Sequence, residues 1–130
     1  GSYLLALAQN NQNIIFVGRV MGEDKEYLLK YSYVNCLVSS SEGMPLSLLE
    51  AMSYGKPCIV SDIPAIRELI DDEWGYWCQV KDVDSTAEQM RNVESIDNIS
   101  DVGKKMADYV LEHHTWDNIA AKYKSYIQTL

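Results

Sequence analysis

Glu42 and Glu50 lie eight positions apart, on either side of a proline that can begin a helix. A carboxylate accepts two hydroxyl donors at once. Pro45 suits the first turn of a helix because its φ is already helical and its missing N–H costs little there. Glu42 precedes that helix, where free N–H groups and the helix dipole favour an anion such as phosphate. One acid at the rim and one within the helix therefore predict a site for a sugar joined to a nucleotide.

The helix that begins at Pro45 is predicted to be largely buried and to end after Tyr54, where Gly55 follows. Its apolar residues fall on nearly every face and are Leu46, Leu48, Leu49, Ala51 and Met52. Glu50 is the exception, because a carboxylate inside such a helix is costly unless a donor binds it. We expect the donor to be a ligand hydroxyl. The alternative is a surface acid paired with Lys56 or Arg67.

Short apolar runs alternate with helical patterns along the chain, which predicts strands separated by helices. The predicted strands are residues 14–17, 36–39, 58–61 and 76–80. The predicted helices are residues 23–33, 45–54 and 64–70, one that begins with a capping box at Ser85–Glu88, and two closing helices at 101–113 and 115–130. This order predicts an α/β fold with a Rossmann-like parallel sheet flanked by helices.

Ligands of open parallel sheets bind beyond the carboxyl ends of the strands. Three predicted loops lie at such ends, namely Gly18–Arg19, Ser39–Gly43 and Ser61–Asp62. We expect them to meet at one rim, with both glutamates belonging to the middle loop and its helix. In the first loop Arg19 can reach a phosphate, although a solvated surface arginine explains it equally well. The third loop is expected to cap the helix that follows it.

Composition limits the classes of function. The chain has 130 residues, enough for one domain with one core. Its net charge of −8 argues against nucleic acid and anionic lipid as partners. No apolar run is long enough to span a membrane, and no secretion signal opens the sequence. The cysteines are odd in number and lie in or beside apolar runs, which favours buried, reduced thiols in a cytoplasmic protein; they are Cys36, Cys58 and Cys78.

Two further polar patterns are interpreted as structural. Asp82-Val83-Asp84 spells an acidic pair that could suggest a metal site, but its place just before a predicted helix indicates loop and capping roles. His113–His114 falls at a predicted helix end, where a histidine can interact with the helix dipole. We therefore expect no metal site at these residues.

Taken in order, the motifs resemble the E-x7-E signature of the retaining GT-B glycosyltransferases of group 1, also called family 4. The matching segments are Leu37–Pro45 with its Ser-Ser-Ser-Glu-Gly-Met-Pro, Leu48–Met52 with its Leu-Leu-Glu-Ala-Met, and Gly55–Asp62. The resemblance extends upstream to 14–20 and downstream to 115–117, so it covers nearly the whole chain.

The resemblance implies a role for each residue of the predicted site. The donor sugar would be held by Glu42, Gly43 and Met44, the phosphates by Leu46 and Arg19, and the ribose hydroxyls by Glu50. The donor would be a nucleoside diphosphate sugar, with no metal needed. For Glu42 the alternative is an exposed acid that interacts only with the helix dipole.

The resemblance also implies an incomplete unit. Residues 1–130 are expected to form a single partial domain, the C-terminal half of a GT-B fold truncated at its N-terminus. Two strands of that domain and a separate acceptor-binding domain would precede Ile14. We therefore expect no transferase turnover by this chain alone. Self-association through exposed sheet edges is a further hypothesis.

The function implied is donor binding within a longer hexosyltransferase. Such an enzyme would transfer a glycosyl unit to the hydroxyl of a saccharide or glycolipid acceptor bound by its N-terminal domain. Bacterial surface polysaccharide or glycolipid synthesis is the expected pathway, in the cytoplasm or at the inner face of the plasma membrane. The alternative is a non-catalytic module that binds a nucleotide sugar or serves assembly only.

Overall fold

The structure is a computed structural model that describes residues 2–118. Its elements follow the order α1 (Ser2–Ala8), α2 (Gly22–Tyr31), β1 (Asn35–Leu37), α3 (Leu46–Ser53), β2 (Cys58–Ser61), α4 (Pro64–Arg67), the 3₁₀ helix η1 (Asp72–Trp74), β3 (Tyr76–Cys78), α5 (Val83–Glu94) and α6 (Ile99–His113). Strands alternate with helices from β1 to α5, which confirms the predicted α/β class.

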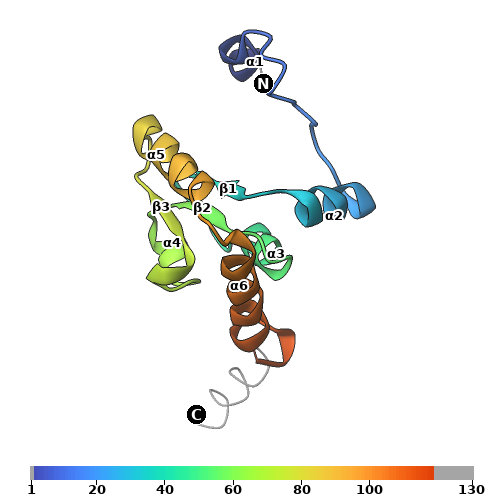
Figure 1. Cartoon of the computed structure of the whole chain (residues 1–130), viewed down its shortest axis with the longest axis vertical. Coiled ribbons are helices and arrows are strands. Elements are labelled where there is room, and N and C mark those ends of the chain that lie inside the picture. Colours follow the sequence, from blue (N-terminus) through green and yellow to red (C-terminus); the bar gives the residue numbers. More distant parts are fainter. Residues whose placement is uncertain (1, 119–130) are drawn as a thin grey trace.

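The three strands form one parallel sheet in the order β1-β2-β3 (Figure 1). Cys36 pairs with Ile59, and Val60 pairs with Trp77. All four residues of β2 are buried, as expected for a central strand covered on both faces. The parallel register brings the carboxyl ends of β1 and β2 to the same edge of the sheet.

The main core lies between the sheet, α3 and α6, and α3 and α6 pack side by side (Figure 1). Its fully buried members include Leu48 and Met52 of α3, Val60 of β2 and Met106 of α6. Burying each such side chain contributes about 1.5–3 kcal/mol. A smaller cluster of Ile59, Cys78 and Val93 forms where α5 packs against the sheet. The site helix α3 is therefore held in place by its own apolar residues.

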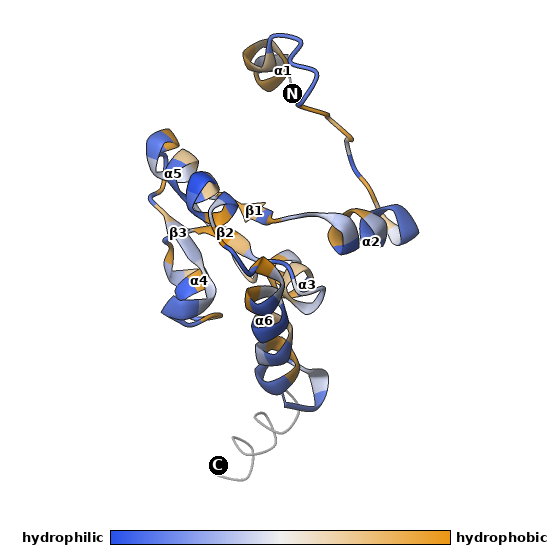
Figure 2. Cartoon of the chain, in the orientation of Figure 1, coloured by the Kyte–Doolittle hydropathy of each residue, from blue (hydrophilic) through white to orange (hydrophobic). Residues whose placement is uncertain are grey.

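Residues 14–17 are not a buried strand, which corrects the prediction. Their side chains are 49–79% exposed and belong to an extended segment that leads from α1 toward α2 (Figure 1). The same stretch is coloured as strongly hydrophobic in Figure 2. An apolar run becomes a strand only when a neighbour pairs with its backbone groups. Within residues 2–118 no strand pairs with this segment.

Other predicted boundaries were wrong in detail. Helix α5 begins before the predicted capping box, because Asp82 is the N-cap and its Oδ1 accepts from the Ser85 N–H at 2.9 Å. The Ser85 hydroxyl instead accepts from the Gln79 N–H. Strand β3 ends at Cys78, two residues early. The predicted helix at 115–130 lies mostly outside the described residues.

Candidate functional site

The loop of residues 39–45 leaves the carboxyl end of β1 and leads into α3. At its start the Ser39 N–H donates to Ser61 Oγ at 2.9 Å, and Ser61 is fully buried at the end of β2. The Ser39 hydroxyl donates to the Ser41 carbonyl at 2.8 Å. The structure therefore joins the second and third predicted loops at one rim. Ser61 serves this contact rather than the predicted cap of α4, whose N-cap is Ile63 with no side-chain cap bond.

The beginning of α3 presents free backbone donors. Pro45 is the N-cap, and the Leu46 N–H donates to the Met44 carbonyl at 2.8 Å. The Leu46 amide is therefore already used within the loop. Within residues 2–118, the N–H groups of Gly43, Met44 and Ser47 have no acceptor. Such a cluster at a helix N-terminus suits an anionic group.

Glu42 and the residues after it are accessible from solvent. Glu42 is half-buried, and in the described part of the chain its carboxylate has no hydrogen-bond or ion-pair partner. The Met44 side chain is 60% exposed and that of Leu46 is 58% exposed. A Cβ added at Gly43 would meet nothing within 4 Å. A ligand can therefore approach this loop directly.

Glu50 lies in the middle of α3 but not in a closed interior. Its side chain is 36% exposed, and its Oε2 is 2.6 Å from Lys25 Nζ on α2. The prediction of a costly buried acid is therefore corrected, because Glu50 reaches solvent and has an ion-pair partner. The alternative of a surface acid with a basic partner agrees with the structure, but the partner is Lys25 and not Lys56 or Arg67. The sequence showed that Lys25 lies on a helix but gave no indication that this helix meets α3.

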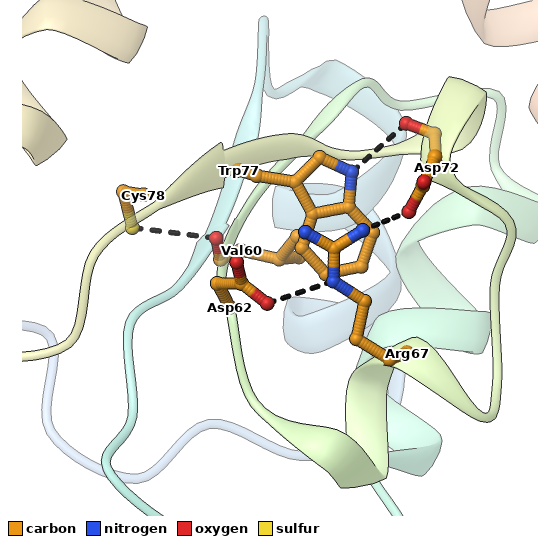
Figure 3. Close-up of polar contacts among 6 residues, drawn as sticks. All are labelled: Val60, Asp62, Arg67, Asp72, Trp77 and Cys78. Carbon is orange, nitrogen blue, oxygen red and sulfur yellow. Dashed lines mark hydrogen bonds and ion pairs between the residues drawn. The ribbon is translucent and has the colours of Figure 1, made fainter.

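Arg67 organises a second polar cluster beyond the end of β2 (Figure 3). Its Nε donates to Asp62 Oδ1 at 2.7 Å, and a second nitrogen pairs with Asp72. The guanidinium lies 3.8 Å from the centroid of the Trp77 ring, and the Trp77 indole N–H donates to the Asp72 carbonyl at 2.8 Å. The hydrogen bond from Arg67 lowers the pKa of Asp62. Asp62 therefore anchors its loop through Arg67 and does not cap α4.

The first of the three predicted loops does not join this rim. Gly18 has a φ of +67°, and Arg19 is exposed in the segment before α2. Within residues 2–118 no hydrogen bond or ion pair connects Arg19 to the loop of residues 39–45. The reason is that residues 14–17 do not enter the sheet.

The thiols differ in their surroundings. Cys58 and Cys78 are buried, as predicted, and burial raises the pKa of Cys58 to about 12. Cys36 is exposed on the edge strand β1, contrary to prediction. Partial desolvation nevertheless raises the pKa of its thiol. All three are free.

Among residues 2–118 no group of three or more acidic, histidine or cysteine side chains is arranged to hold a metal ion. None of the helices in that range has the length and apolar character needed to cross a membrane.

The fold and the loop before α3 define a class of α/β domain that appears in glycosyltransferases of the GT-B type. The structure of sucrose-phosphate synthase from Thermosynechococcus elongatus aligns with 98% of this chain at a TM-score of 0.81, with 22% identity and 33% of that chain covered. Residues 2–122 match the family model "Glycosyl transferases group 1", so the chain belongs to this family.

Two curated relatives are similar in sequence. N-acetyl-alpha-D-glucosaminyl L-malate synthase of Bacillus anthracis is 28% identical over 127 residues, which cover 94% of this chain and 33% of that protein. UDP-Gal:alpha-D-GlcNAc-diphosphoundecaprenol alpha-1,3-galactosyltransferase of Escherichia coli is 48% identical over 59 residues, which cover 45% of this chain and 15% of that protein. The chain thus spans a third or less of the length of these relatives.

Proposed function

We propose that this chain binds the nucleoside diphosphate sugar that serves as donor in a glycosyl transfer. The loop of residues 39–45 and helix α3 form the binding surface. Glu42 accepts hydroxyl groups of the sugar, beside the N–H groups of Gly43 and Met44. Glu50 accepts hydroxyl groups of the ribose. The observation that carries the proposal is the set of unpaired N–H groups at the start of α3. The Glu42 carboxylate precedes these groups, and the Glu50 carboxylate lies one helical turn after them.

The phosphates would lie between the two acids, at the N-terminus of α3. With the Leu46 amide already bonded to Met44, the Ser47 N–H becomes the available donor in the first turn. For Arg19 to contribute to phosphate binding, the segment before α2 would have to approach the start of α3. Backbone donors are needed here because the net charge of −8 does not attract a diphosphate.

The proposed reaction is carried out by a longer protein of which this chain is the C-terminal donor-binding part. A glycosyl unit passes to the hydroxyl of a saccharide or glycolipid acceptor with retention of configuration. Family membership supports the reaction class, and the Escherichia coli relative, named for UDP-Gal and a lipid-linked diphosphate acceptor, supports this donor and acceptor type. We propose the cytoplasm, or the inner face of the plasma membrane, as the place of this reaction.

Nucleotide titration tests the proposal. UDP, GDP and ADP are added to the chain and thermal unfolding is followed, with Glu50→Ala as the test variant and Glu88→Ala, an exposed acid on α5, as the control. A ligand present at about 100 times its Kd stabilises the native state by roughly 2.7 kcal/mol. We expect a shift with one nucleotide that Glu88→Ala keeps and Glu50→Ala loses. Absence of a shift with all three nucleotides, or an equal shift in Glu50→Ala, would contradict the proposal.

A further inference from the structure

In the described part of the chain, Lys25 is the only side chain paired with the carboxylate of Glu50. Its Nζ lies 2.6 Å from Oε2, while the other carboxylate oxygen, Oε1, has no partner among these residues. The two side chains are 41% and 36% exposed, so both lie at the surface where a ligand can reach them. The pair therefore fixes one oxygen of Glu50 and leaves the other available.

The ion pair contributes little to holding the fold. Helix α2 has no buried residue, whereas α3 buries four of its own residues in the core. Exposed ion pairs typically contribute only about 0–1 kcal/mol to stability. The ion pair can instead affect ligand binding by holding Glu50 in one orientation, because a long acidic side chain loses rotamer freedom when it binds a ligand. A carboxylate that is already oriented binds a hydroxyl at lower entropic cost.

We propose that Lys25 is a positioning residue of the donor site, a role that rests on the proposed function of Glu50. Lys25 holds Oε2 and thereby orients the carboxylate so that Oε1 faces the hydroxyl groups of the donor ribose. Helix α2 carries none of the ligand-binding residues proposed above, and through Lys25 it nevertheless takes part in recognition of the nucleotide. The effect acts through Glu50 and requires no contact between Lys25 and the ligand.

The test measures discrimination between ribose and deoxyribose. Calorimetric titration of the full chain with UDP, GDP and ADP first identifies the nucleotide that binds. The affinity for this nucleotide is then compared with the affinities for its 2′-deoxy and 3′-deoxy forms. Loss of a hydrogen bond to a charged group weakens binding by about tenfold or more. We therefore expect the wild type to bind the ribonucleotide about tenfold more tightly than the deoxy forms. Lys30→Met, a matched control on the same helix, should show the same preference. Lys25→Met should reduce it at least about threefold, as an unrestrained carboxylate binds less well.

A double-mutant cycle shows whether Lys25 acts through Glu50. Glu50→Gln should abolish the preference, and Lys25→Met should have no further effect in the Glu50→Gln background. A merely structural ion pair would alter unfolding but would leave the ratio of affinities unchanged.

The outcomes separate the two proposals. If Glu50→Gln abolishes the preference while Lys25→Met leaves it unchanged or larger, the positioning role is wrong and the proposed function stands. If Glu50→Gln keeps the preference, or no nucleotide binds, the ribose role of Glu50 is wrong and the role of Lys25 fails with it.

Discussion

Gly103 of α6 lies against Gly55, which follows the C-cap residue Tyr54 of α3, so closely that a Cβ on Gly103 would overlap the Gly55 carbonyl oxygen. Gly55 itself has a φ of +69°, in the left-handed region that glycine adopts without strain. These two glycines set how closely α6 packs beside α3. Because α3 carries Glu50, this contact also determines the position of the candidate site.

Gly103→Ala should therefore destabilise the chain. The added methyl group meets backbone, which cannot move aside as a flexible side chain would, and overpacking costs about 1–3 kcal/mol. Higher helix propensity returns at most about 1 kcal/mol. Urea unfolding should show a lower midpoint for Gly103→Ala and a nearly unchanged one for Gly43→Ala, where the space is open. A Gly103→Ala variant as stable as the wild type would show that the helices are not in such close contact.

Asp82 is expected to act as a helix cap. Its carboxylate accepts from the Ser85 N–H at the start of α5, and replacing such a cap by alanine costs about 1 kcal/mol. Asparagine caps about as well, so Asp82→Asn should have nearly the stability of the wild type. Urea unfolding of both variants provides the measurement. Equal destabilisation by Asp82→Ala and Asp82→Asn would mean that the negative charge matters more than the hydrogen bond.

Because of the cluster around Arg67, the free energy of unfolding should depend on pH in the acidic range. Arg67 lowers the pKa of Asp62 in the folded state, so this contribution is complete above the unfolded pKa of about 3.9. It is lost as pH falls through the lower folded pKa. Arg67→Met should therefore be less stable than the wild type at pH 7, and the difference should shrink below about pH 4.

Urea midpoints measured from pH 7 to pH 3 test this dependence. Arg91→Met is the control, because in the described part of the chain Arg91 has no acidic partner. A difference between wild type and Arg67→Met that stays constant down to pH 3 would assign the role of Arg67 to stacking on Trp77 alone.

The three cysteines should differ in alkylation. Iodoacetamide reacts with the thiolate, so Cys36 at the exposed edge strand should react first, and faster as pH rises toward its raised pKa. Cys58 and Cys78 are buried and should react only in denaturant. Mass spectrometry should find one label per native chain and none in Cys36→Ser. Native labelling of Cys58 would indicate that the sheet opens readily.

Local sequence patterns determined the element types and the candidate residues. The apolar run Cys58–Ser61 and the Pro45 and Gly55 signals at the ends of α3 correspond to observed features, because periodicity, proline and glycine act over a few residues. The Glu42–Glu50 spacing was likewise visible in the sequence and indicated the family.

Only the tertiary structure decided which distant groups meet. Lys25 with Glu50 joins two helices, and Ser39 with Ser61 joins the ends of two strands. Such pairs depend on how elements pack, which no local pattern contains. The apolar run at 14–17 also shows that a local pattern does not determine tertiary contacts. Its composition suits a strand, but a strand forms only where a neighbour supplies hydrogen-bond partners, and none of the described strands does so.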